Sequence, residues 1–181
     1  MIIQKAKLNK LSLVLGMGMV ITAGTATAAN QGSGSVSFTG TIIDAPCSIK
    51  AESSSQTVDL GEISTAALKN GGKSSPRAFS IGLEMCDTSE MSDVSATFTG
   101  AASSSDPDLL GITGTASGAS IAITNGAGEI IKLGEASPAQ TIQDGNNELA
   151  FSAYLQGDAA SGASITPGEF FSVANFTLAY N

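Results

Sequence analysis

The chain has 181 residues and contains no His and no Trp. Its formal net charge is −8, and an acidic chain lacks the basic patches that bind nucleic acid or anionic membranes. The absence of His excludes Ser-His-Asp and Cys-His nucleophile arrangements. Charge and composition therefore disfavour a nucleic-acid-binding protein and the common hydrolases.

The first residues have the pattern of a cleaved export signal. Lysines at positions 5, 7 and 10 precede the apolar run Leu11–Thr22, and Ala26-Thr27-Ala28 supplies the small residues of a cleavage site. A membrane anchor is the alternative, but the run is shorter than the roughly 20 residues that span a bilayer. We expect residues 1–28 to be removed, which leaves one domain's length of chain and loses three lysines, so the net charge becomes −11.

A segment with strict two-residue periodicity opens the mature chain. Small polar residues occupy the odd positions from Ser35 to Thr41. The even positions form the other face of an extended segment: Gly34, Val36, Phe38, Gly40 and Ile42. Periodicity alone favours the first strand of the domain itself. The preceding Gly/Ser/Asn tract Asn30–Gly34 instead favours a segment free to leave the domain, and Gly40 is typical of a close backbone approach.

Short alternating runs, separated by turns of Gly, Ser, Asn and Asp, predict the remaining strands. The strongest turn is Asn125-Gly126, and at most one helical turn is expected, at Ser64–Leu68. Strands at this spacing predict an all-β antiparallel sandwich. The predicted strands are Thr57–Gly61, Phe79–Cys86, Val94–Phe98, Ile121–Ile123, Leu149–Ala153 and Phe176–Tyr180, and the turn at Asn125-Gly126 precedes the apolar Ile130 and Leu133.

The two cysteines, Cys47 and Cys86, both lie in the mature chain. In an exported protein such a pair most simply forms one disulfide. Closing a loop of this length stabilises the fold by about 4 kcal/mol in the chain-entropy model. A metal site would need further ligands nearby.

Three short motifs were considered for chemistry, and none of them supports a catalytic, metal or cofactor site. Asp106-Pro107-Asp108 pairs two carboxylates on a solvated Pro/Ser loop that has no evident basic or apolar shell around them, so a surface loop is favoured over acid–base machinery. The oxygen-rich run Asp144–Glu148 lacks the ordered spacing of a calcium loop. Gly126-Ala127-Gly128 lacks the strand and helix that flank a phosphate-binding loop. We expect no enzyme activity and no cofactor.

Several motifs, taken together in their order along the chain, resemble those of the chaperone–usher pilins, the family of type 1 and P-type pilus subunits. The run Val36–Cys47 resembles the N-terminal extension and first cysteine of that family. Thr57–Gly61 and Phe79–Cys86 resemble the family's second strand and the strand that ends in its second cysteine. The C-terminus resembles its chaperone-recognition motif, with Gly168 fourteenth from the end, Tyr180 penultimate, and an alternating set between them: Phe170, Phe176 and Leu178.

The resemblance implies an incomplete immunoglobulin-like sandwich that a strand from a neighbouring subunit completes. It implies three regions: the signal peptide 1–28, a donor-strand extension 29–42 and a pilin domain 43–181. The donor residues would be Gly34, Val36, Phe38, Gly40 and Ile42. The chaperone and acceptor edge would be Gly168, Phe170, Phe176, Leu178 and Tyr180, although the small Ser172 and Ala174 weaken part of this edge.

The partners that the resemblance implies are other pilin subunits, a periplasmic chaperone and an outer-membrane usher, with the finished protein in the fimbrium at the cell surface. The implied role is a major rod subunit that supports adhesion. A minor adaptor and a glycan-binding tip adhesin are alternatives, but tip adhesins in this family carry an additional lectin domain. A secreted sandwich enzyme or inhibitor is a further alternative, which the missing catalytic groups disfavour.

Overall fold

The computed structural model describes residues 33–158 and 164–181 and divides the chain into two parts, Met1–Thr41 and Ile42–Asn181. The predicted signal peptide lies outside the described residues. Residues 33–41 form no helix or strand, and all of their side chains are exposed. The fold described below is that of Ile42–Asn181.

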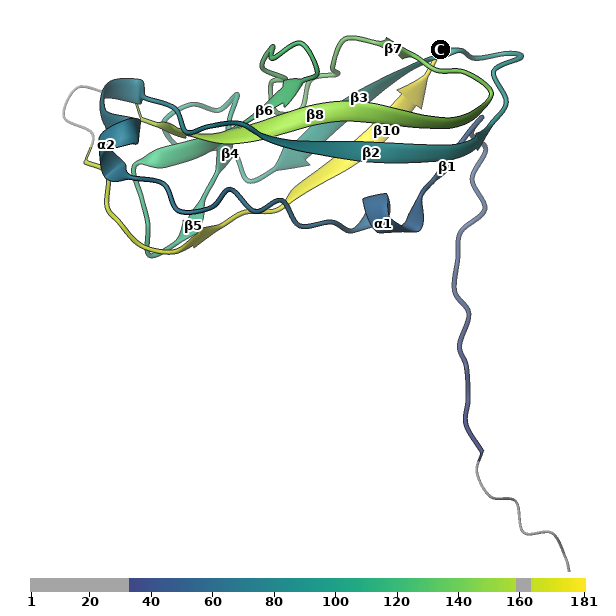
Figure 1. The fold of residues 1–181 in the computed structure, drawn as a ribbon, viewed down its shortest axis with the longest axis horizontal. Helices are drawn as coiled ribbons and strands as arrows, with labels where there is room; N and C mark the ends of the chain where they lie inside the picture. Colours follow the sequence, from purple (N-terminus) through teal and green to yellow (C-terminus); the bar gives the residue numbers. More distant parts are fainter. Residues whose placement is uncertain (1–32, 159–163) are drawn as a thin grey trace, which may run out of the picture. The chain divides into compact units, whose positions relative to one another are not determined.

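One layer of this fold is a five-stranded antiparallel sheet, with β2 and β8 as its longest strands (Figure 1). β2 pairs with β8 from Arg77 opposite Ala153 to Cys86 opposite Gly145. The strand order is β1-β2-β8-β6-β4, and the bounds are β1 (Ser48–Ile49), β2 (Arg77–Cys86), β8 (Gly145–Gly157), β6 (Ala119–Asn125) and β4 (Leu110–Gly111).

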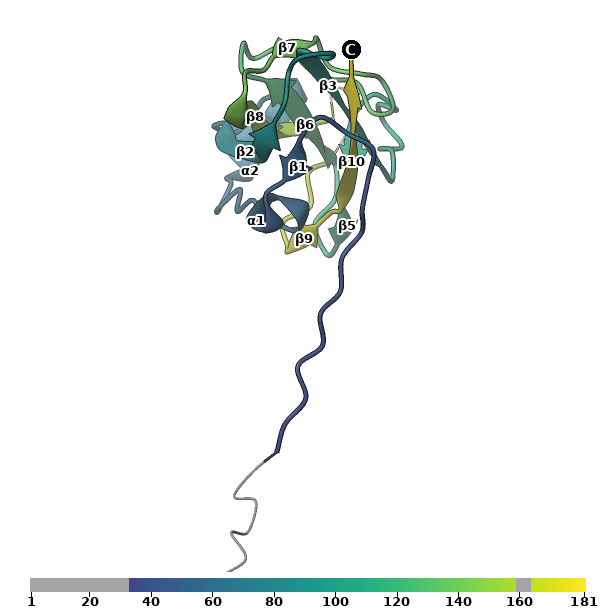
Figure 2. The same cartoon turned by 90° about the vertical axis from the view of Figure 1, so that its right-hand side faces the viewer.

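The second layer is formed by shorter sheets, and Figure 2 shows β3 and β10 on the opposite side of the molecule from β2 and β8. One sheet has the order β10-β3-β7, with β10 (Ala174–Tyr180), β3 (Asp93–Gly100) and β7 (Gln140–Thr141). A further ladder joins β5 (Thr113–Gly114) to β9 (Phe170–Phe171). The short helices are α1 (Ala51–Ser54), α2 (Thr65–Leu68) and the 3-10 turn η1 (Lys69–Gly71).

Three phenylalanines join the two layers at the centre of the core. Phe79 and Phe151 come from the large sheet and stack with their ring centroids 5.6 Å apart. Phe98 from β3 meets Phe151 edge-to-face at 5.2 Å and Phe79 at 6.2 Å. These geometries are the favourable ones for aromatic pairs. A chain with few aromatic residues therefore concentrates three of them where the sheets meet.

The alternation predicted for Phe79–Cys86 holds over most of β2 but is wrong at Met85. Ile81 and Leu83 are completely buried, as expected, whereas Met85 is 72% exposed and has a φ of 53°. The pairing with β8 shifts between Leu83 and Cys86. A β-bulge of this kind inserts one residue into the strand and changes the face of those that follow. The bulge turns Cys86 into the core and Met85 out.

The helical turn predicted at Ser64–Leu68 is confirmed as α2, and the Ser64 hydroxyl accepts a hydrogen bond from the Ala66 N–H as an N-cap. The strand predicted at Thr57–Gly61 is wrong, because this segment forms no ladder with the described residues, and the Asp59 carboxylate accepts the N–H of Gly61, whose φ is 75°. The turn predicted at Asn125-Gly126 is confirmed, and Ile130 after it forms an isolated antiparallel bridge with Thr124. The Asn125 side chain accepts the N–H groups of Ala127 and Glu129 in a tight turn, after which Ile131 is buried while Ile130 is 42% exposed.

Candidate strand-binding groove

The last strand has one unpaired side. Along Ala174–Tyr180, β10 pairs with β3, and it is the end strand of its sheet among the described residues. β9, just before it in the chain, pairs only with β5 there. The Ser172 hydroxyl between them donates to the Gly111 carbonyl, at 2.6 Å. The segment from Phe170 to Tyr180 therefore has one flank held by the domain and one flank with unused backbone hydrogen-bonding groups.

An apolar groove with a volume of about 1220 Å³ lies along the first part of this open segment. Residues 57–63, residues 165–172 and Ala174 line it. Side chains from both layers form the floor, including Phe79 and Phe98. The further apolar side chains that line it include Val58, Leu60, Ile63, Leu110, Ile165 and Phe170.

The predicted acceptor residues lie along the open strand, but only some of them line the groove. Gly168 and Phe170 do so, whereas Phe176, Leu178 and Tyr180 continue the same face along β10 and pack against the main core. From Phe171 to Asn181, odd-numbered residues are exposed and even-numbered ones are half-buried. Burial raises the pKa of the Tyr180 phenol above its ordinary value. The alternation predicted for this strand is confirmed.

Gly168 has a steric reason to be glycine. A Cβ at this position would lie 2.8 Å from the Ala116 backbone nitrogen and would also collide with the Thr115 hydroxyl. The neighbouring chain is held close because the Glu169 carbonyl accepts the N–H groups of Thr115 and Ala116. Any side chain at position 168 would push apart the two segments that close this end of the groove.

Sequence reasoning missed most of the groove wall. Leu110, Ile112 and Ile165 lie far apart in the sequence and have no periodic pattern of their own. The alternation of Val58 and Leu60 was the one available signal, since both side chains are half-buried against the groove. The predicted small contribution of Ala174 is only partly right, because Ala174 packs against both large core clusters.

The predicted donor residues are strongly exposed. Val36, Phe38 and Ile42 are 77%, 91% and 102% exposed. Gly34 and Gly40 are exposed as well, and the close backbone approach expected at Gly40 stays a prediction. Large apolar side chains that are exposed close together on one segment are typical of an interaction site.

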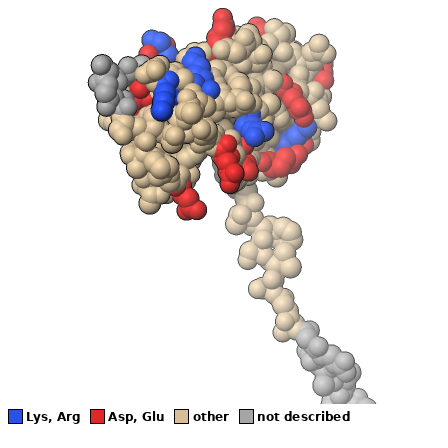
Figure 3. Space-filling model, turned by 60° about the vertical axis from the view of Figure 1, so that its left-hand side comes forward, with Lys and Arg blue, Asp and Glu red and all other residues tan. Residues whose placement is uncertain are grey.

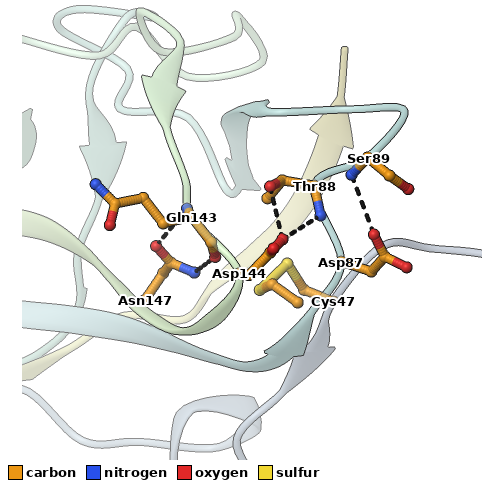
Figure 4. Close-up of a disulfide and its surroundings, with 8 residues drawn as sticks. Cys47, Asp87, Thr88, Ser89, Gln143, Asp144 and Asn147 are labelled. Carbon is orange, nitrogen blue, oxygen red and sulfur yellow. Dashed lines mark hydrogen bonds between the residues drawn. A yellow bond between two sulfur atoms is a disulfide. The ribbon is translucent and has the colours of Figure 1, made fainter.

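The end of the domain at which the C-terminus lies is closed by a disulfide (Figure 4). Cys47 and Cys86 are bonded, as the sequence predicted, and both are buried in the main core cluster. Beside them the Asp144 carboxylate accepts hydrogen bonds from the N–H and the hydroxyl of Thr88, at 2.8 and 2.7 Å. These bonds lower the pKa of Asp144. The oxygen-rich run Asp144–Glu148 is therefore a bend at Asp144 followed by the first residues of β8.

The surface carries charges of both signs, and Figure 3 shows Lys, Arg, Asp and Glu dispersed over a largely uncharged face. Lys132 pairs with Asp108 at 3.1 Å and Lys50 with Glu148 at 3.8 Å. Within residues 33–158 and 164–181, no group of three or more metal-ligating side chains gathers. No helix in that part of the chain is long and apolar enough to cross a membrane.

Comparison with known proteins gives consistent matches. The family model for fimbrial proteins matches residues 36–181. The Fimbria A protein of Serratia marcescens is 61% identical over 96% of this chain and 99% of that protein. The Major MR/P fimbria protein of Proteus mirabilis is 53% identical over 96% of this chain and 99% of that protein. A solved chaperone–usher pilus, described for the uncoiling of its rod, superposes with a TM-score of 0.75 at 35% identity, covering 86% of this chain and all of that one.

Proposed function

The chain belongs to the fimbrial protein family, and from this we propose that it builds a surface fimbria by lending residues 34–42 to the groove of the next copy. It is a structural subunit with an incomplete immunoglobulin-like sandwich, not an enzyme. The observation that carries the proposal is the groove beside an unpaired last strand, in a chain that also displays an exposed alternating segment.

The chemistry of the two parts is complementary. An extended segment that adds to an open sheet edge gains backbone hydrogen bonds, while alternate side chains fill pockets and give specificity. Val36, Phe38 and Ile42 would face inward beside the even-numbered side chains of the open segment 170–180, at whose beginning the groove lies. Each apolar side chain gains roughly 1.5–3 kcal/mol on full burial. Their polar neighbours Ser37 and Thr39 would face solvent. Three such anchors and a ladder of backbone bonds make a joint that dissociates very slowly.

The geometry of this contact leads to a fibre. Each subunit offers an extension at one site and a groove at another, so the contact is head-to-tail and not self-complementary. A head-to-tail contact that does not close into a ring extends without limit. We propose a homopolymer in which this chain is the major rod subunit, as the name of the Proteus mirabilis relative suggests. An adaptor or tip position has no such support.

We propose that a periplasmic chaperone covers the groove before assembly and that an outer-membrane usher exchanges it for the next subunit. An uncovered edge with exposed apolar side chains is an aggregation hazard. The edge at Phe176, Leu178 and Tyr180 would present the chaperone contact, and Ser at Leu178 and Tyr180 would abolish co-purification of the chaperone.

The three proposed regions of the chain remain the signal peptide 1–28, the extension 29–42 and the domain 43–181.

The test moves the donor strand into the same molecule. A mature chain lacking residues 29–42 receives a copy of Gly34–Ile42 after Asn181, joined by an Asn-Gly turn, which connects antiparallel strands. Linked in this way, the strand acts at a high effective concentration. The product should be a monomer that needs no chaperone and melts far above the truncated chain.

Two variants of the appended copy provide matched controls. Arg at both Phe38 and Ile42 should abolish the stabilisation, because a buried unpaired charge is costly. Arg at both Ser37 and Thr41 adds the same charge on the solvent face, and most of the stabilisation by the appended strand should remain. A truncated chain that is already a stable monomer without the appended strand would refute the proposal.

A further inference from the structure

An apolar pair lies on the outer face of the open strand, on the side away from the core. Phe171 and Val173 are each 66% exposed, although their even-numbered neighbours are half-buried. Farther along the same outer face come Asn175, Thr177 and Ala179, which are polar or small. The outer face of this strand is thus apolar only at its beginning.

The N-terminal segment has the matching pattern in reverse order. Its odd positions are Ser or Thr from Ser35 to Thr41, and the next odd residue is Ile43, which is 57% exposed. In an extended strand these side chains all lie on the face opposite to Val36, Phe38 and Ile42. The solvent face of the proposed donor strand is therefore polar throughout, and the next outward position, Ile43 at the start of the domain, is apolar.

Antiparallel pairing brings the two apolar ends together. If Phe38 lies opposite Leu178, then Ile43 lies opposite Val173. If the strand is shifted by one pocket, with Phe38 opposite Phe176, then Ile43 lies opposite Phe171. Side chains one step along the diagonal remain within reach of an aromatic ring. Ile43 thus meets the exposed pair in both registers.

We infer that Ile43 of one subunit packs on Phe171 and Val173 of the next, forming an outer contact that closes the joint from the solvent side. The inference rests on the proposed donor-strand function. Its occupant is a second copy of this chain, because Phe171 also lines the groove and the outer pair is continuous with the proposed interface. The contact would shield the end of the donor strand, where water first reaches the ladder of backbone bonds.

The most direct test is disulfide trapping in fibres of the full-length chain. Ile43→Cys combined with Phe171→Cys or with Val173→Cys should give a covalent ladder of subunits on non-reducing gels after air oxidation, because directly opposite residues satisfy disulfide geometry. Ile43→Cys combined with Ala179→Cys should give none. The native cysteines are already bonded to each other.

A second cysteine pair separates the two hypotheses. Ser37→Cys combined with Thr177→Cys or with Ala179→Cys reports on the donor joint but not on Ile43. A ladder from a Ser37 pair without one from either Ile43 pair would overturn the outer contact and leave the proposed function standing. Absence of ladders from every pair would overturn both.

An energetic measurement provides the second arm. Fibres carrying Ile43→Ser or Phe171→Ser should dissociate about 2–4 °C lower than unchanged fibres, the shift expected for loss of one cross-strand apolar pair. The two changes together should cost little more than either alone, since they remove the same contact. Thr41→Ser, on the same solvent face but without an apolar contact to lose, is the matched control and should lower the temperature by less than Ile43→Ser. Strictly additive losses would contradict a contact between the two side chains.

Discussion

The centre of the large sheet and the last strand are built from the same alternating pattern but end in different environments. In β2 and β8 the inward residues Ile81, Leu83 and Phe151 are at most 1% exposed, because both strands have partners on both sides. In β10 the inward residues Phe176 and Leu178 stay half-buried, because the strand has a partner on one side only. The core is therefore fully covered at the centre of the large sheet and only partly covered along β10.

This difference separates two classes of substitution. A change in the closed region should destabilise the domain by the same amount whether or not a donor strand is bound. A change along the open strand should matter more once the groove is filled, since the donor strand completes the burial of those side chains.

Phe151→Ala should have the largest effect. Phe151 contacts both other rings of the central aromatic group, at centroid distances of 5.2 and 5.6 Å. Truncating such a residue costs about 3–5 kcal/mol through lost burial and the cavity left behind. Denaturant unfolding of the truncated chain and of the strand-appended chain should show the same loss. A loss that appears only in the strand-appended chain would place Phe151 in the open region.

Cys47→Ser or Cys86→Ser should cost nearly as much, about 4 kcal/mol, since the disulfide closes a separation of 39 residues. Recovery of subunits from the periplasm should fall for both variants equally. Thiol labelling of assembled wild-type protein provides the check, and two free thiols there would show that the pair is not bonded in the fibre.

Gly168→Ala should have an intermediate effect at the open end, on the order of 1–3 kcal/mol. The added Cβ would meet the Thr115 hydroxyl and the Ala116 nitrogen, so that the end of the groove must move. Binding of a Gly34–Ile42 peptide should weaken more than the stability of the free domain. Gly126→Ala is the control, because its Cβ would have ordinary contacts at 3.6 Å. Equal losses in the two variants would remove the steric argument.

Much of this contrast could be predicted from the sequence, and the parts that could not depend on long-range contacts. Alternation identified the inward residues of β2, β8 and β10, since a buried sheet face imposes a period of two. It could not reveal the bulge at Met85, because a single inserted residue leaves no compositional mark. The groove wall at Leu110 and Ile165 arises from loops that only the folded chain brings together.

The smallest expected effect concerns alkaline pH. Burial raises the folded-state pKa of Tyr180 above its unfolded value of 10.0. The stability from the neutral phenol is therefore complete below about pH 10 and is lost as the pH rises through the folded pKa. Tyr180→Phe should lessen the loss of stability above pH 10, measured by unfolding at each pH. Identical pH profiles for the two proteins would show that Tyr180 is not buried in solution.

The central claim is that the flank of β9 and β10 opposite β3 and β5 is open until a second copy fills it. Amide hydrogen exchange of the domain lacking residues 29–42, with and without a Gly34–Ile42 peptide, tests it most directly. The account predicts fast exchange in the free domain for those amides of residues 170–180 that point to the open flank, away from β3 and β5. These amides should be strongly protected once the peptide is bound, while exchange in β2 and β8 should not change. Full protection of those amides before the peptide is added would contradict it.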